Sequence, residues 1–244
     1  MEQRKRPGGD GGLGYYTSWE KSKGNGCIYC GKPATTREHV PSKAFLVEPY
    51  PENLSTIPAC FECNNGYSED EKYVACFLDV LKSHIYLDYK LQKETDSRLS
   101  KDEKLKSILN EQIRTEDGKV FIRPDNQRIQ RILLKLAKGH AGFELDYVNF
   151  DNTETQIWYE FIFNMSENDL YEFNSIPTYQ VYPEVGSRGM YIIQNIVTDD
   201  AQTFANWMDV QDRQYRYQVS YNDNDSISVK IVILELLYCE VNFE

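Results

Sequence analysis

The chain has 244 residues, of which 41% are hydrophobic and 27% charged, and its formal net charge is −11. This length fits one or two domains, and we expect two. No apolar run reaches the roughly 20 residues that a membrane-spanning helix needs, and no apolar segment follows the charged start, so the sequence predicts a soluble, cytoplasmic protein without anchor or secretion signal.

Charge is distributed unevenly along the chain. Residues 1–43 contain eight Lys or Arg against four acids, a net +4, so the remainder carries −15. An acidic surface repels the phosphates of nucleic acid, whereas a basic end can contact them locally. Basic ends also occur simply because they aid solubility, and both interpretations remain open.

The first predicted elements are irregular. Residues 1–20 are rich in Gly, Lys and Arg without an apolar pattern, and we expect a flexible basic tail. From 27 to 68, turn-forming residues are so dense that only short strands and loops fit. A metal has to replace the missing core of this region.

Two Cys-x-x-Cys pairs supply candidate ligands for that metal. Without an export signal the thiols are expected to stay reduced, so the pairs indicate a metal rather than disulfides. Four thiolates close a tetrahedral Zn²⁺ site with no open position, which makes such a zinc structural. The 29 residues between the pairs exceed the spacing of common zinc ribbons, and a functional insertion is expected there. The predicted ligands are Cys27, Cys30, Cys60 and Cys63.

The insertion contains Glu38-His39 and an Asn53 followed by leucine, and Asn64 comes directly after the second cysteine pair. With these residues the segment from about 25 to 70 resembles the HNH endonucleases that carry a zinc-binding cysteine tetrad. Their pattern is Cys-x-x-Cys, acid-His, Asn-Leu and Cys-x-x-Cys-Asn. The resemblance implies the ββα-metal fold, in which a short hairpin carries the histidine and a helix carries the last metal ligand.

Transferred residue by residue, the resemblance implies that His39 is the general base and that Asn53 holds the loop and orients the imidazole. It also implies that Glu38 and Asn64 bind a catalytic Mg²⁺ or Mn²⁺, with Asn65 as the alternative to Asn64. Many members have Asp at the first of these positions and His at the last. The oxygen donors present here suit the same cations.

The chemistry of these residue types agrees with phosphodiester hydrolysis. A histidine with an ordinary pKa near 6.5 is a base at neutral pH, and a bound cation neutralises charge on the phosphate and on the leaving oxygen. The predicted function is endonucleolytic cleavage of DNA to 5′-phosphate and 3′-hydroxyl ends. Only the resemblance implies a setting in bacterial or phage defence.

Two other functional hypotheses remain open at this stage. One is a catalytically inactive, zinc-stabilised module that binds nucleic acid or protein. The other is a nuclease that its acidic body keeps inactive until a partner or small ligand binds. The sequence does not reveal the oligomeric state or the DNA target.

Beyond the cysteines the sequence predicts helices. Ser68 and Glu71 have the spacing of a capping box, and apolar positions at helical spacing predict a helix over about 69–87. A second apolar stripe predicts a helix over 126–138, with Gly139 as its C-terminal stop.

The C-terminal part predicts an antiparallel sheet. Stretches rich in aromatic and β-branched residues and bounded by turn residues are typical of strands. Asn222–Asp225 marks a hairpin turn. The predicted strands are 155–163, 179–182, 190–193, 214–220 and 226–234.

The predicted fold class is therefore α+β, with a small zinc-stabilised N-terminal nuclease domain. We expect this domain over 21–90, a charged helical connector over 91–124 and an α+β domain with an antiparallel sheet over 125–244. Substrate selection, regulation, or contact with a protein partner or small-molecule regulator is the role left for the last domain.

Overall fold

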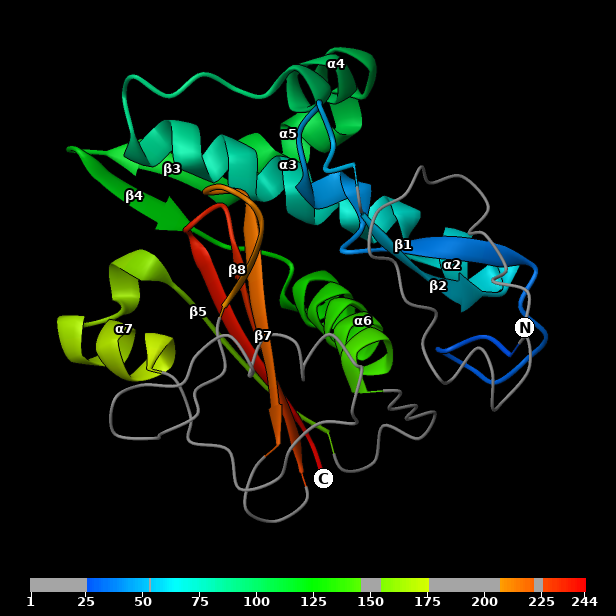
Figure 1. The fold of residues 1–244 in the computed structure, drawn as a ribbon. Coiled ribbons are helices and arrows are strands. Elements are labelled where there is room, and N and C mark those ends of the chain that lie inside the picture. Colours follow the sequence, from blue (N-terminus) through cyan, green and yellow to red (C-terminus); the bar gives the residue numbers. More distant parts are fainter. Residues whose placement is uncertain (1–25, 53, 146–154, 176–206, 222–225) are drawn as a thin grey trace.

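A computed structural model describes residues 26–52, 54–145, 155–175, 207–221 and 226–244 (Figure 1). The architecture is α+β with antiparallel sheets, as the sequence predicts. Within these residues there are two two-stranded sheets and one five-stranded sheet with the strand order β5-β9-β8-β7-β6. None of the described helices is long and apolar enough to cross a membrane.

The N-terminal part consists of a hairpin and a short helix. Strand β1 (Thr36–Val40) pairs antiparallel with β2 (Ser55–Ala59), and their connection contains the 3₁₀ turn η1 (Lys43–Phe45). Helix α2 (Phe61–Gly66) follows β2 directly. The chain order is therefore strand, strand, helix.

Helix α3 (Ser68–Ile85) lies where the apolar pattern predicts a helix, but the predicted capping box is wrong. The N-cap position belongs to Tyr67, and the Ser68 hydroxyl donates to a backbone carbonyl of the preceding helix at 2.8 Å. The Glu71 side chain is buried and accepts a hydrogen bond from Lys135. The Glu71 carboxylate, which the local spacing predicted to cap the helix, thus forms a tertiary ion pair with Lys135 instead.

The segment predicted as a helical connector is helical only in its first part. Helices α4 (Lys93–Lys101) and α5 (Glu103–Gln112) are followed by a hairpin of β3 (Ile113–Glu116) and β4 (Lys119–Ile122). The two turn residues, Asp117 and Gly118, both have positive φ, 50° and 74°. An Asp-Gly pair favours this tight hairpin turn, so the dipeptide could have indicated the β3–β4 hairpin.

Helix α6 (Asn126–Leu145) does not stop at Gly139, and that prediction is wrong. A Cβ at Gly139 would lie 3.5 Å from Val40 Cγ2 and 3.7 Å from Ile57 Cδ1. The glycine therefore brings the helix close to the β1–β2 hairpin. The helix continues because the residues of its last turns are buried, among them Phe143.

Three strands of the large sheet match predicted strands. They are β5 (Thr155–Phe161), β7 (Tyr215–Tyr221) and β8 (Ile227–Ile233). The edge strand β6 (Met208–Gln211) and the interior strand β9 (Leu237–Phe243), between β5 and β8, were not predicted. The predicted strands 179–182 and 190–193 and the turn at 222–225 lie outside the described residues.

Strand β9 was missed because its turn has no typical turn residue. Leu234 and Glu235 follow β8 with positive φ values of 58° and 54°. Gly, Asn or Asp usually occupy such positions, so nothing in the sequence indicated a turn between β8 and β9. The pairing of β8 with β9 along their full length compensates for this backbone conformation.

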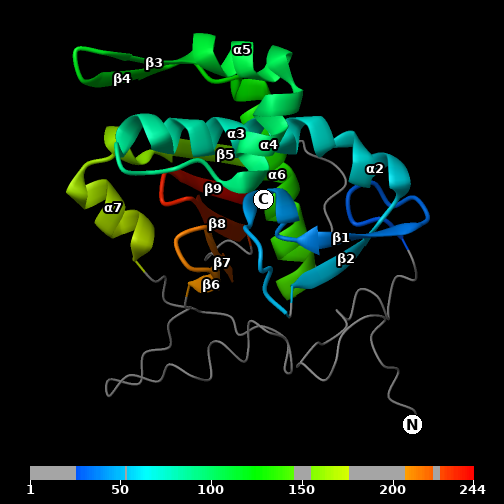
Figure 2. The same ribbon diagram turned by 90° about the horizontal axis from the view of Figure 1, so that it is seen from above.

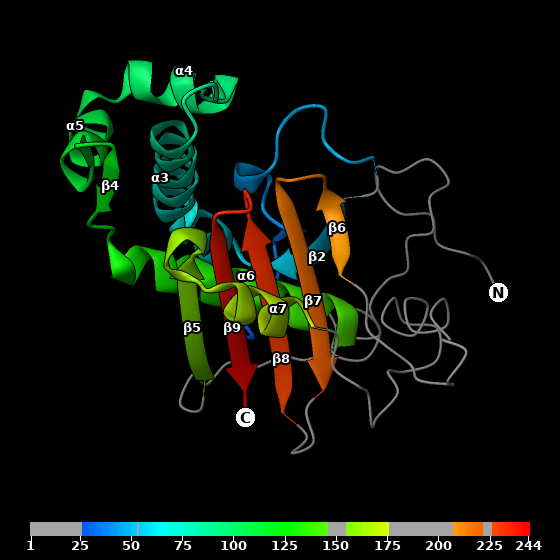
Figure 3. The same cartoon turned by 90° about the vertical axis from the view of Figure 1, so that its left-hand side faces the viewer.

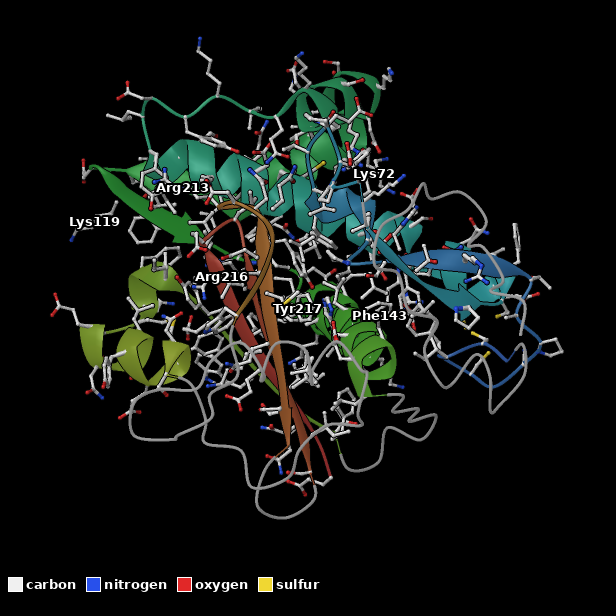
Figure 4. The ribbon with its side chains drawn as sticks, viewed as in Figure 1. Lys72, Lys119, Phe143, Arg213, Arg216 and Tyr217 are labelled. Atoms are coloured by element: carbon white, nitrogen blue, oxygen red, sulfur yellow. The ribbon has the colours of Figure 1, made fainter. Side chains whose placement is uncertain are left out.

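Helix α6 lies between the large sheet and the β1–β2 hairpin (Figure 1). Seen face-on, the sheet has α6 behind it and α7 (Glu167–Asn174) in front of it (Figure 3). Seen from above, α3 and α6 cross and the hairpin lies beside α6 (Figure 2). One hydrophobic core joins α3, α6 and the large sheet. A second, small cluster surrounds the cysteines and includes Phe143 of α6, which is labelled in Figure 4.

The contact at Gly139 leads to a stability prediction. Replacing Gly139 with alanine should leave the free energy of unfolding unchanged or raise it by up to about 1 kcal/mol, because the new methyl finds ordinary contacts and alanine favours the helix. Replacing it with leucine should lower that free energy by about 1–3 kcal/mol, because the larger side chain overpacks the hairpin. Urea denaturation of both variants measures this, and equal stability of the two would contradict the close approach.

Candidate functional site

The four predicted metal ligands form one cluster. Their Sγ atoms all lie within 4.8 Å of one another, and those of Cys30 and Cys60 are 3.7 Å apart. Zn–S bonds of about 2.3 Å in a tetrahedron place the sulfurs about 3.8 Å apart. The prediction that the four cysteines can hold a metal ion such as zinc is confirmed.

Local backbone structure presents each cysteine pair to the cluster. The first pair lies in a turn in which the Gly31 amide donates to the Cys27 carbonyl at 2.8 Å, and Gly31 has a positive φ of 73°. In the second pair, Cys60 is the N-cap of α2, and the amide of Cys63 donates to its Sγ at 3.4 Å. Burial raises the pKa of Cys63, so metal binding has to displace a proton there.

Strand β1 has two chemically different faces, since successive side chains of a strand point to opposite sides. Thr36, Glu38 and Val40 share one face, which packs against α2 and α6. His39 points to the other face. Glu38 and His39 can therefore reach the same bound group only if that group lies at an edge of β1. Among the described strands, β2 pairs with one edge of β1, which leaves the other edge for such a group.

Glu38 is buried in a cluster of charges. Its Oε1 lies 3.0 Å from Nζ of Lys135 on α6, and the same Nζ lies 2.5 Å from Oε1 of Glu71 on α3. The side chains of Lys135 and Glu38 are 1% and 7% exposed. Burial raises the pKa of Glu38, and the Lys135 ammonium opposes this rise. We call Glu38, Glu71 and Lys135 the buried charge triad.

His39 has the electrostatic surroundings of a neutral imidazole. Burial lowers its pKa, the positive charge of Lys43 lowers it further, and an interaction with the backbone of Ser55 opposes the shift. Lys43 lies in η1, in the connection between the two strands. An imidazole that stays neutral at neutral pH can accept a proton, as a general base must.

Asn64 binds to β1, whereas Asn65 turns back to its own helix. Nδ2 of Asn64 donates to Thr36 Oγ1 at 3.0 Å and to the carbonyl of Arg37 at 3.4 Å. Nδ2 of Asn65 donates to the carbonyl of Phe61, also in α2, at 3.1 Å. Of the two candidates for the last cation ligand, Asn64 is the one that faces the strand carrying Glu38.

The residues predicted for the second site are thus brought together in part. Glu38, His39 and Asn64 all lie on or against β1, whereas Asn53 lies outside the described residues. Sequence reasoning missed Glu71 and Lys135. No signal in the sequence pairs these two residues with Glu38. Glu71 and Lys135 are 64 residues apart, and their contact depends on how α3 and α6 cross.

The face of α6 opposite the hairpin carries polar contacts to the large sheet. Nε2 of His140 lies 2.8 Å from the hydroxyl of Tyr215, and Tyr217 stacks on His140 with 3.7 Å between ring centroids. The Tyr217 hydroxyl, labelled in Figure 4, donates to Glu144 at 2.5 Å. These bonds fix α6 on β7, and α6 in turn carries Lys135 to the hairpin.

Comparison of the chain with protein-family models, with curated proteins and with solved structures finds no match.

Proposed function

We propose that the protein is a metal-dependent endonuclease of the HNH type that cleaves DNA. One observation carries the proposal: α2, which begins at the cysteine cluster, delivers Asn64 to β1 two residues before Glu38 and three before His39. A hairpin with the base and a helix with the last ligand is the arrangement that the resemblance implies for the ββα-metal fold. A zinc ion at the four cysteines would fix the start of that helix.

The donor atoms around Glu38 suit a small divalent cation. Asn64 binds to Thr36, and the side chains of Thr36 and Glu38 project from the same face of β1. Their backbone positions are about 7 Å apart, since a strand rises about 3.3 Å per residue. To share Mg²⁺ or Mn²⁺, which oxygen donors suit, the Glu38 carboxylate and the Asn64 amide oxygen would turn toward the same point beside β1. A cation there supplies the charge that neutralises the scissile phosphate.

The residues of the chain then have distinct tasks in hydrolysis. His39, kept neutral by burial and by Lys43, takes the proton of the attacking water. Lys43 adds positive charge on the same side, where the phosphate is expected. A phosphate that lies along the edge of β1 that β2 leaves open would contact both faces of the strand, with His39 on one and Glu38 on the other. Phosphodiester cleavage of this kind leaves 5′-phosphate and 3′-hydroxyl ends.

The test is a cleavage assay with purified zinc-loaded protein. Supercoiled plasmid is incubated with Mg²⁺ or Mn²⁺, and with EDTA as the control, and the ends of the products are labelled to identify 5′-phosphates. We expect nicking that depends on the added cation. Absence of cleavage of plasmid, single-stranded DNA and RNA under all cations, with and without cell extract as a source of partners, would contradict the proposal.

A second candidate is a zinc-stabilised binding module without catalysis. The observation that favours it is the pairing of Glu38 with Lys135, which already compensates the charge of the expected cation ligand. This candidate predicts DNA or protein binding that requires zinc but is unaffected by replacing His39. An inactive protein that binds a DNA duplex in an electrophoretic mobility shift would support it.

A further inference from the structure

The buried charge triad has a charge that does not suit a free divalent cation. Two carboxylates and one ammonium sum to −1, and Asn64 adds none. A divalent cation at Glu38 would bring the summed charge of the triad and the ion to +1, and burying a net charge is unfavourable. One phosphate group of DNA carries −1, and with it the sum for triad, ion and phosphate becomes zero.

The position of Lys135 strengthens this charge balance. Its ammonium has three partners, which are the two carboxylates of the triad and the ring of Tyr67, 5.2 Å from Nζ to the ring centroid. Arg131, whose guanidinium also lies over the Tyr67 ring, is bound to Asp70 at 2.6 Å and to the carbonyl of Gly66 at 3.0 Å. Asp70 also pairs with Arg128 at 3.6 Å, and Arg128 pairs with Asp125 at 3.4 Å, so these two arginines and two aspartates balance one another and leave the charge of the triad unchanged.

We propose that Lys135 prevents the catalytic cation from binding until a DNA phosphate is present. The inference rests on the proposed function and names a regulation of the same site. The ammonium holds Glu38 Oε1 in the absence of substrate, and it repels a cation that approaches Glu38 alone. Phosphate and cation then bind together, and the acidic protein does not collect cations at its reactive site without a substrate.

The first experiment measures Mn²⁺ binding without DNA and without any cleavage. Zinc-loaded wild-type protein, Lys135→Met and the control Lys72→Met are titrated with Mn²⁺, and free Mn²⁺ is followed by electron paramagnetic resonance. Lys72, which lies on α3, is the control because its ammonium forms an ion pair of similar length, 2.6 Å to Asp102, outside the triad. We expect Lys135→Met to bind Mn²⁺ at least about tenfold more tightly than the other two proteins.

Two additions make this experiment decisive. Glu38→Gln in the Lys135→Met background should remove the gained Mn²⁺ affinity, which locates the ion at Glu38. The thermal midpoint of Lys135→Met should rise when Mn²⁺ is added, because the ion replaces the ammonium between two carboxylates. Lys135→Gln, which keeps hydrogen bonding without charge, serves if the methionine variant does not fold. Folded variants that bind Mn²⁺ no more tightly than wild type would overturn the proposal.

The second experiment leaves Lys135 in place. The Mn²⁺ affinity of His39→Ala, in which cleavage is expected to be slow, is measured with and without a short DNA duplex, and Mn²⁺ binding by the duplex alone is subtracted. We expect the duplex to tighten Mn²⁺ binding at least about tenfold. Equal affinity in both conditions would refute the inference. Neither experiment measures cleavage, so an inactive wild-type protein refutes the proposed function without deciding the role of Lys135.

Discussion

Replacing His39 with alanine should lower the rate of DNA cleavage by about 10²–10⁴-fold, because the attacking water then loses its general base. Binding of DNA and of Mn²⁺ should persist, since Glu38 and Asn64 lie on or against the other face of β1. The measurement is single-turnover cleavage of a labelled duplex at saturating cation, together with duplex binding by fluorescence anisotropy.

His84→Ala is the matched control for that variant. His84 lies in the last turn of α3, where its Nδ1 is 2.8 Å from the hydroxyl of Thr115, and it has no role in the proposed chemistry. Its cleavage rate should equal that of wild type. Equal nicking by His39→Ala and wild type would remove His39 from the reaction and would attribute the activity to a contaminant or to another site.

Removing the metal at the cysteines should unfold the N-terminal part of the chain. The hydrophobic cluster around the cysteines is small and consists of Cys27, Ile28, Tyr29, Val40, Ile57, Ala59, Cys60 and Phe143. Structural zinc sites contribute about 10–16 kcal/mol of apparent folding free energy in zinc-finger peptides. We therefore expect Cys60→Ser/Cys63→Ser to lose its zinc and the protection of β1, β2 and α2 against hydrogen exchange.

The large sheet should survive this change, because α3, α6 and the sheet have their own core. Elemental analysis should find one zinc per wild-type chain and none in the double variant. Cys76→Ser is the control: Cys76 is fully buried in α3 and does not belong to the cysteine cluster, so its variant should keep the zinc. Zinc at one equivalent in the double variant, or unchanged protection of the hairpin, would show that the four cysteines do not hold the metal.

The local patterns that could be read from the sequence were those with short-range causes. The two Cys-x-x-Cys pairs predicted a four-sulfur cluster because each turn presents both of its thiols to the same side. The aromatic and β-branched stretches predicted β5, β7 and β8 because their alternation follows from the pleat of a strand. The α3 helix followed from its apolar spacing.

The errors arose where tertiary contacts overrode local preference. Gly139 looked like a helix stop, but close packing on Val40 uses the missing side chain and the helix continues to Leu145. Glu71 looked like a capping residue, but Lys135 binds it in the interior. Strand β9 was missed because its turn is formed by Leu234 and Glu235, whose side chains give no turn signal.

The sequence by itself determined which reactive groups the segment from Cys27 to Asn64 contains: four thiols, a carboxylate, an imidazole and an amide. Only the tertiary structure decided on which face of β1 each group lies and which charged side chains surround it. The alternation of β1 separates Glu38 from His39, and the crossing of α3 and α6 brings Glu71 and Lys135 to Glu38 from 33 and 97 residues away. Such contacts follow from the packing of whole helices, which no local pattern of residues encodes.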